Sequence, residues 1–294
     1  MPVLVLQRVS VWLDAFAPER GAFAHALEWA AHLNLPLRAI AAPRQYGQTF
    51  RLRGTAAVEC GGHEDDAEPL VRACAATCDR SGIPHDALTW RGPIVTGVRA
   101  MLDPADLCVF GKELPARLKG VLLRESLQSP WAPALVCPTT WQPVSRILVL
   151  YQHADPPPAY LGAVAEVCRR FDSRPVVLAV ARTDAEANWR QRAAETALAA
   201  YGLSAEFDTV VGGDVRSAVA WAAKWRRCSH VIVAKRHAVG WWRWLRGDPI
   251  EQLLGLSDRL TFLALPDTLG PADRAGEPAA GERVTRTNGS GLVR

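Results

Sequence analysis

Hydrophobic and polar residues alternate along this chain in two series that repeat the same order of patterns. Each series opens with a short, continuous apolar run of strand length, Val3–Leu6 and Ile147–Leu150. Apolar residues at helical spacing follow in Gly21–Asn34 and Ala159–Phe171. Continuous apolar strands are typical of parallel sheets covered on both faces, so we expect each series to open with a strand and a helix of that kind.

The patterns that come next also agree between the two series. A capping box of Thr183 and Glu186 predicts a helix start, and the glycines at Ser81-Gly82 and Tyr201-Gly202 predict helix ends. The further elements expected are strands at Leu37–Ala42, Pro175–Ala181, Ala87–Trp90 and Ala205–Val210, and helices at Ile94–Leu102 and Val215–Arg227. The alternation of strand and helix is therefore regular in both series.

The closing segments, 108–138 and 231–266, share one layout. Each has an apolar strand, a basic loop, an amphipathic stretch and a second apolar strand that ends in proline. Repetition of a fixed order of elements indicates internal duplication. We therefore predict an α/β fold with two tandem open parallel-sheet domains, right-handed crossovers and helices on both faces.

Domain boundaries follow from where these periodicities break. We expect one domain over 1–140 and a second over 145–267, with a linker near Thr139–Ser145. Residues 44–62 form an insertion in the first domain. Residues 268–294 contain few large apolar side chains, so they are predicted to be a disordered tail.

Composition narrows the class of protein. The chain has 294 residues, a length that suits two domains. Its seven cysteines are scattered through apolar patterns, as in a reducing compartment. No apolar run reaches the roughly 18–20 residues that span a bilayer, and Met1–Leu6 lacks the features of a signal peptide, so we expect a cytoplasmic protein without a membrane span. The net charge of +4, without a Lys/Arg block, gives no reason to expect a nucleic-acid partner.

Ligands of open parallel sheets bind beyond the carboxyl ends of the strands, and in both series the loop after the fourth strand is charged. There the chain resembles the universal stress protein family, in its order of elements, in Gly92-Pro93, Gly213 and Gly247, and in the closing strands ALVCP and TFLALP. The resemblance implies adenine-nucleotide-hydrolase-like domains and a nucleotide motif G-x-x-G, nine residues, then G-[ST]. Such a motif binds phosphate through backbone N–H groups, a hydroxyl and a helix N-terminus.

Both copies depart from that motif. The first and last positions fall on Gly111 and Glu125 in the first half and on Ala234 and Asp248 in the second. A carboxylate at the hydroxyl position repels a triphosphate. The family's aspartate after the first strand is replaced by Gln7-Arg8 and by Gln152-His153. We therefore expect no cofactor and disfavour ATP and AMP. Glu125 and Asp248 also suit a plain helix start.

Positive charge persists in these loops without the glycines. An anion held by side chains is one interpretation, and a solvated or inter-domain basic surface is the favoured one. The candidate nucleotide-like loop comprises Gly111, Lys112, Arg124, Glu125, Gln152, Ala234, Lys235, Arg236, His237, Arg243, Gly247 and Asp248. Tryptophans among arginines at 240–246 make the second loop the expected contact surface of the molecule.

The motifs of nucleophilic, metal-dependent and P-loop enzymes are missing from the sequence. We predict a non-enzymatic, tandem universal-stress-protein-like protein that acts in stress-linked regulation through protein contacts. Domains of the family often pair through their last strands, so the resemblance implies that Ala134–Cys137 and Thr261–Leu265 pair within the chain. Whether the whole chain also forms a homodimer stays open. Two other functions stay open: an AMP, ATP or anion sensor that uses Lys235, Arg236 and Arg243, and a nucleotide-hydrolysing or nucleotidyl-transfer enzyme.

Overall fold

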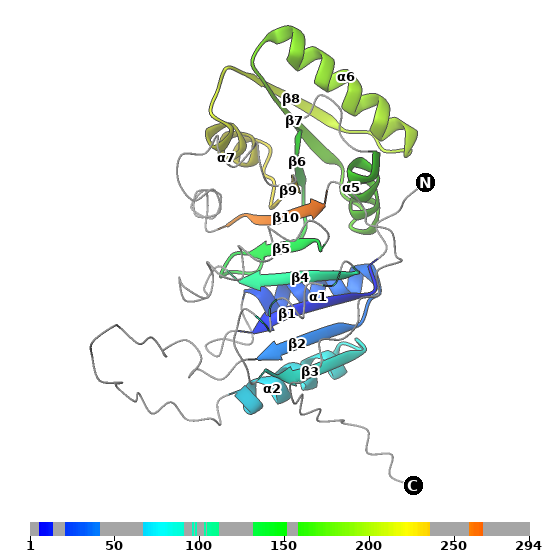
Figure 1. Cartoon of the computed structure of the whole chain (residues 1–294), viewed down its shortest axis with the longest axis vertical. Helices are drawn as coiled ribbons and strands as arrows, with labels where there is room; N and C mark the ends of the chain where they lie inside the picture. The colour runs from blue at the N-terminus through cyan, green and yellow to red at the C-terminus, as the bar shows by residue number, and fades with distance from the viewer. Residues whose placement is uncertain are drawn as a thin grey trace, which may run out of the picture.

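Ten strands form one continuous sheet in the computed structural model of this chain (Figure 1). The structure describes residues 6–13, 21–41, 67–90, 96, 98, 103, 105–111, 132–151, 158–235 and 259–266. Residues up to 138 are called the first half below, and those from 145 onward the second half.

The two halves contain the same strands in the same order. In the first half these are β1 (Arg8–Leu13), β2 (Leu37–Ala41), β3 (His85–Thr89), β4 (Asp106–Gly111) and β5 (Ala134–Cys137). In the second half they are β6 (Ile147–Tyr151), β7 (Pro175–Ala181), β8 (Glu206–Val211), β9 (His230–Lys235) and β10 (Thr261–Pro266). The sheet order is β3-β2-β1-β4-β5-β10-β9-β6-β7-β8, so each half mirrors the other about its centre.

The halves meet at the last strand of each. β5 and β10 pair in the antiparallel sense, with Leu135 opposite Leu263, whereas all other neighbouring strands are parallel. This pairing within the chain confirms the prediction for the two closing strands. It also removes two sheet edges that would otherwise be open to a second chain.

Helices cover the sheet, and their ends have the expected local chemistry. The described helices are α1 (Ala22–Leu33), α2 (Ala67–Arg80), α5 (Pro158–Arg170), α6 (Asp184–Ala200) and α7 (Val215–Trp225). The Thr183 hydroxyl accepts a hydrogen bond from the Glu186 N–H at 3.2 Å, which confirms the cap of α6. Gly82 and Gly202 have φ of 66° and 70°, values in the left-handed region where glycine is favoured, and they follow the ends of α2 and α6.

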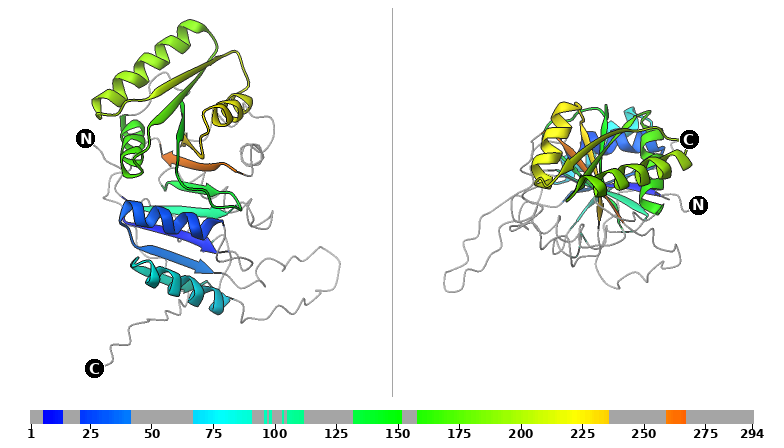
Figure 2. Two further views of the ribbon diagram at one scale, coloured as in Figure 1. Left: turned by 180° about the vertical axis from the view of Figure 1, so that it is seen from behind. Right: turned by 90° about the horizontal axis from the view of Figure 1, so that it is seen from above.

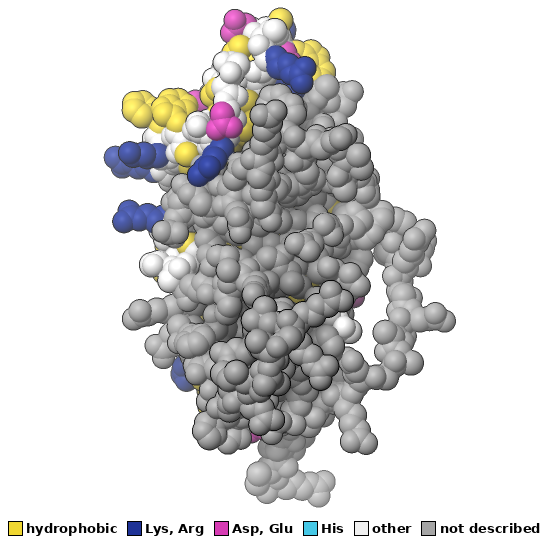
Figure 3. Space-filling model, turned by 60° about the vertical axis from the view of Figure 1, so that its left-hand side comes forward, with side chains coloured by type: hydrophobic (Ala, Val, Ile, Leu, Met, Phe, Trp, Pro, Cys, Tyr) yellow, Lys and Arg dark blue, Asp and Glu magenta, His cyan; other side chains and the backbone are white. Residues whose placement is uncertain are grey.

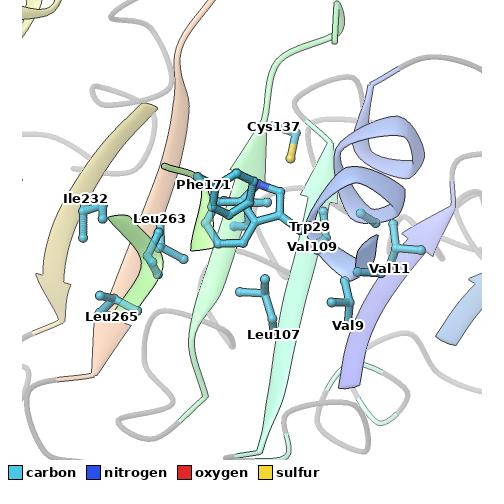
Figure 4. Packing of buried hydrophobic residues seen from close by; sticks show 14 of the residues in the cluster. Val9, Val11, Trp29, Leu107, Val109, Cys137, Phe171, Ile232, Leu263 and Leu265 are labelled. Carbon is cyan, nitrogen blue, oxygen red and sulfur yellow. The ribbon is translucent and has the colours of Figure 1, made fainter. Parts of the chain in front are cut away.

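One hydrophobic core is common to both halves. It lies under α1, α2, α5 and α6, and it joins Val9 and Val11 of β1 to Ile232 of β9 and Leu263 of β10 (Figure 4). Trp29 of α1 contacts Phe171, just after α5, with ring centroids 4.7 Å apart. The seam between the halves is therefore buried by side chains of both.

The opposite face of the sheet has two separate clusters. Figure 2 shows that α7 and α5 lie on different sides of the sheet. Val219 and Ala222 of α7 pack with Leu148 and Leu178 of the second half. In the first half, Trp12 and Phe110 pack with Val98. Thr96 and Val98 are helical, within the helix predicted at Ile94–Leu102, and the rest of that helix lies outside the described residues. The predicted α/β class with helices on both faces is confirmed.

The first strand was predicted in the wrong place. β1 begins at Arg8, and the Gln7 N–H donates to the carbonyl of Ala105 at 2.7 Å just before it. The prediction failed because Ser10 interrupts the apolar run of β1, although this serine is fully buried. The insertion at 44–62 and the tail at 268–294 lie outside the described residues.

Candidate functional site

The candidate site lies at the carboxyl ends of β1 and β4 in the first half and of β6 and β9 in the second. Strand order reverses there, because β2 and β4 lie on opposite sides of β1, and β7 and β9 lie on opposite sides of β6. Crevices at such reversal points bind ligands in open parallel sheets. Gly111 is the last residue of β4 and Ala234 is one residue from the end of β9, and both are half-buried.

Strand register shows which residues correspond between the halves. Val9 pairs with Leu37, the first residue of β2, and Ile147 pairs with Pro175, the first residue of β7. Asn34 and Asp172, the left-handed residues that end α1 and α5, fall at the same spacing, so this correspondence has no gap. Val9 also pairs with Leu107, and Ile147 with His230. Gly111 and Ala234 are therefore true counterparts, as the sequence motif required.

The position of β1 corrects one element of the site. Because β1 ends at Leu13, the residue directly after the first strand is Asp14, not Gln7 or Arg8. Its counterpart after β6 is Gln152. The first half therefore has the acidic residue whose loss was predicted, and the second half does not. Loop length was the missed signal: a strand that ended at Leu6 would leave 15 residues before α1, whereas β1 leaves eight, closer to the usual 2–6 residues or so.

A tyrosine occupies the reversal point in the second half. Tyr160 of α5 is buried, and its hydroxyl lies 3.3 Å from the carbonyl oxygen of Leu150 and 3.4 Å from that of Ile232. Tyr160 thus places its hydroxyl between the second-last residue of β6 and the third residue of β9. Its counterpart in the first half is Ala22, which has no such side chain. The two halves therefore differ in side-chain volume at matched positions beside the reversal of strand order.

Most other residues of the predicted loop lie outside the described part of the chain. Lys235 is the last residue of β9, and the backbone register places it opposite Pro266. The other predicted residues, Lys112, Arg124, Glu125, Gln152, Arg236, His237, Arg243, Gly247 and Asp248, lie outside the described residues, as does Asp14. The predicted basic and acidic groups of this loop stay a sequence-based prediction.

A buried pair of histidines lies at the seam, and sequence analysis missed it. The rings of His25 on α1 and His230 on β9 are 6.0 Å apart, edge to face. Burial lowers the pKa of His25 to about 4, and the nearby backbone of Thr140 opposes this shift. Burial, and then the nearby His25, lower the pKa of His230 to about 3. Both rings are therefore neutral at pH 7.

Cysteines and metal ligands give no sign of a reactive centre in the described part of the chain. Burial raises the pKa of the Cys74 thiol to about 12 and that of Cys78 to about 11, so neither is a thiolate at pH 7. No cluster of three or more His, Cys, Asp or Glu side chains suited to a metal ion occurs among the described residues. None of the helices described is long and apolar enough to cross a membrane.

Comparison with solved structures gives strong likenesses along most of the chain. A functionally unknown protein from Pseudomonas aeruginosa is 16% identical, with a TM-score of 0.59, over 90% of this chain and 94% of its own. A universal stress protein from Archaeoglobus fulgidus is 13% identical, with a TM-score of 0.56, over 89% of this chain and 97% of its own. The cytoplasmic domain of a prokaryotic cation chloride cotransporter is 9% identical, with a TM-score of 0.54, over 89% and 96%.

No protein-family model matches the sequence, and no curated protein matches it. At identities of 9–16%, the structural likenesses establish the fold. The chain has the fold of the universal stress proteins, present twice and joined through the last strand of each copy. The resemblance seen in the sequence is thus confirmed at the level of fold.

Proposed function

We propose that this chain is a non-enzymatic, universal-stress-protein-like regulator that works through protein contacts, and that the second half has lost the family's way of binding ATP. The position of Tyr160 is the observation that supports this most directly. Its ring is buried, and its hydroxyl lies between the carbonyl groups of Leu150 and Ile232, beside the reversal point where Ala234 and Gln152 replace the family's glycine and aspartate. A nucleoside would have to displace this buried ring.

The arrangement of the two halves also supports a contact-making role. The pair is built into one chain by β5 and β10, so its geometry does not depend on protein concentration. A fold of the same layout forms the cytoplasmic domain of a prokaryotic cation chloride cotransporter. That likeness supports the idea that a doubled fold of this kind works as a module attached to, or in contact with, other proteins.

A second candidate function is the sensing of a nucleoside or nucleotide by the first half. Asp14 follows β1 and Gly111 ends β4, so two of the residue types that the family uses are present there. Ala22 has a much smaller side chain than Tyr160, its counterpart in the second half. Glu125 opposes a triphosphate at the hydroxyl position, so adenosine or AMP suits this half better than ATP.

Calorimetric titration of the full chain with Mg-ATP, AMP and adenosine tests both candidates. The primary proposal predicts no heat of binding at millimolar ligand and no turnover of ATP. Binding of AMP or adenosine that is abolished by Asp14→Ala and kept by the matched Gln152→Ala would establish the second candidate. Turnover of ATP that disappears in Lys235→Ala would instead support an enzyme.

Protein contacts are tested by cross-linking in the source cell. The proposal predicts a defined set of cross-linked proteins that changes between growing and stressed cells. The same set recovered under both conditions would overturn the stress-linked role, and no cross-linked protein under either condition would overturn the contact-making role.

A further inference from the structure

The outer face of α7 exposes two tryptophans. Trp221 and Trp225 are 52% and 69% exposed, they are one helical turn apart, and their ring planes lie within 6° of parallel with centroids 6.2 Å apart. Together they form one apolar surface. They are more exposed than Trp141 and Trp189, which are 44% and 41% exposed, whereas Trp12 and Trp29 are buried.

The core of the second half does not need these tryptophans. The inner face of α7 is made of small residues, Ala218, Val219, Ala222 and Ala223, and these pack on β6 and β7. The tryptophans therefore contribute little to the packing of the helix on the sheet. Their presence on the outer face calls for a partner that covers them.

The charge around the tryptophans is positive. Val215–Arg227 contains four basic residues and no acidic residue. Arg226 is neutralised by Asp208 and Glu206 of β8. Arg216, Lys224 and Arg227 are exposed, and none of the three forms an ion pair with another described residue.

The acid that begins α7 is already hydrogen-bonded. Asp214 caps α7, and its carboxylate accepts hydrogen bonds from the N–H and the hydroxyl of Ser217, each at 2.9 Å. Figure 3 shows hydrophobic side chains beside Lys and Arg side chains in the upper part of this side of the molecule. The surface therefore suits an anionic partner with an apolar layer.

We propose that the outer face of α7 binds an anionic lipid surface. Tryptophan rings partition into the interface between headgroups and acyl chains, and Lys and Arg side chains on the same helix are attracted to acidic headgroups. Each basic side chain near such a surface contributes about 1 kcal/mol at physiological salt. Two tryptophans and three basic side chains fit reversible binding. A second copy of this chain is a poorer occupant, because two positive surfaces repel.

Vesicle co-sedimentation of the full chain tests this. We expect binding to mixed phosphatidylcholine–phosphatidylglycerol vesicles, little binding to phosphatidylcholine alone, and weakening of the former by salt. W221A/W225A should lower the partition coefficient by about tenfold or more, equivalent to about 1.4 kcal/mol. K224E/R227E should remove the preference for anionic vesicles. Urea unfolding of each variant checks that it folds.

The matched control is Trp189→Ala on α6. Trp189 is 41% exposed and lies on the opposite face of the sheet, so its removal should leave vesicle binding unchanged. Equal binding to neutral and anionic vesicles, or wild-type binding by W221A/W225A, would overturn the proposal.

Two further outcomes would also overturn it. One is that the chain binds neither kind of vesicle but retards single-stranded oligonucleotides in a gel, and that W221A/W225A abolishes this shift. The outer face of α7 would then bind nucleic acid. A chain that forms a dimer in light scattering, lost in W221A/W225A, uses α7 to bind a second copy. The proposal is independent of the proposed function, since neither nucleotide binding nor its absence changes the expected result.

Discussion

The first and second halves have the same strands, but they differ at matched positions. At the carboxyl edge, Asp14, Gly111 and Ala22 correspond to Gln152, Ala234 and Tyr160. At the amino edge, the buried Asp106 of β4 corresponds to Ser229, just before β9. The backbone order thus survives exchanges of charge, volume and polarity, because it depends on the alternation of apolar positions and on caps rather than on any one polar residue.

The two halves also contribute different side chains to the seam between them. Trp29 and His25 of α1 correspond to Val167 and Ala163 of α5, so the first half provides the large rings that cross to the second half. The second half contributes Phe171 and His230 to the same contacts, and the corresponding residues of the first half are Leu33 and Leu107. The junction is therefore asymmetric although the strands around it are related by symmetry.

The largest effect is expected from Trp29→Ala. The buried indole packs on Phe171, so its loss should leave a cavity at the seam and cost about 3–5 kcal/mol in the free energy of unfolding. Val167→Ala at the matched position should cost roughly 2 kcal/mol. Urea denaturation followed by circular dichroism gives both values. Because Trp29 joins the halves, its loss should also separate one transition into two, and an equal cost for both variants would disprove the asymmetry.

Asp106→Ala should remove the hydrogen bonds that join β4 to β1 at the amino ends of these strands. One carboxylate oxygen, Oδ2, accepts hydrogen bonds from Arg8 Nε at 2.9 Å, Arg8 Nη2 at 2.6 Å and the Ser10 hydroxyl at 2.8 Å. Burial raises the pKa of Asp106, and the hydrogen bonds from Arg8 and Ser10 oppose that shift. Its removal leaves a guanidinium unpaired and a buried hydroxyl unsatisfied, which we expect to cost about 2–4 kcal/mol in unfolding free energy.

Ser229→Ala is the matched change in the second half. Its hydroxyl accepts from the Ser145 N–H at 3.1 Å and lies 2.9 Å from His230 Nδ1, so no charge is left unpaired when it is removed. The expected cost is about 1 kcal/mol. Chemical denaturation of both variants at pH 7 measures the difference, and a larger cost for Ser229→Ala than for Asp106→Ala would contradict it.

Acid should weaken the seam through His25 and His230. Their pKa values are near 4 and 3 when folded and near 6.5 when unfolded, so the unfolded chain takes up protons first as the pH falls. Stability contributed by each neutral ring is present above pH 6.5 and is lost as the pH falls from there to the folded pKa, by up to about 1.4 kcal/mol per pH unit. Between pH 6.5 and 5 both histidines therefore act in the same direction.

Two variants that copy the other half sharpen this test. His230→Leu introduces the residue type found at Leu107, and His25→Ala introduces the one found at Ala163. Each should reduce the slope of unfolding free energy against pH by up to about 1.4 kcal/mol per unit in this range. Denaturation curves at several pH values measure the slope, and an unchanged slope in both variants would show that these rings are not what titrates.

Local signals in the sequence were enough for most of the fold. The continuous apolar run Pro175–Ala181 predicted β7, and the range Gly21–Asn34 predicted α1. The pairing of the two closing strands was also predicted from the sequence. β1 was misplaced because Ser10 interrupts its apolar run. This buried serine is tolerated because its hydroxyl donates to Asp106, a residue distant in the chain. Local pattern does not contain that information.

The candidate site was less predictable for the same reason. Whether Tyr160 points along the sheet or away from it, and whether His25 meets His230, depends on packing across strands that are far apart in sequence. Trp221 and Trp225 have the spacing of core residues on a helix, yet the small side chains of α7 pack on the sheet instead. Periodicity identifies a face, and only the tertiary structure shows which face is covered.

The smallest expected effect compares Glu28 of α1 with Glu166, its counterpart on α5. Glu28 reaches the segment between the halves: Oε2 accepts from Trp141 Nε1 at 3.0 Å and Oε1 from the Val144 N–H at 3.2 Å. Glu166 instead pairs with Arg169 and Arg170 of its own helix. Glu28→Ala should therefore cost about 1 kcal/mol in unfolding free energy, and Glu166→Ala about 0.5 kcal/mol.

Limited proteolysis separates these two roles better than denaturation does. Chymotrypsin cleavage after Trp141 should speed up in Glu28→Ala, because the tryptophan side chain and the backbone of Val144 lose their common acceptor. Glu166→Ala should leave that rate unchanged, since its partners lie within α5. Equal acceleration in both variants would mean that the cleavage follows global stability, and that α1 holds the junction no more firmly than α5 does.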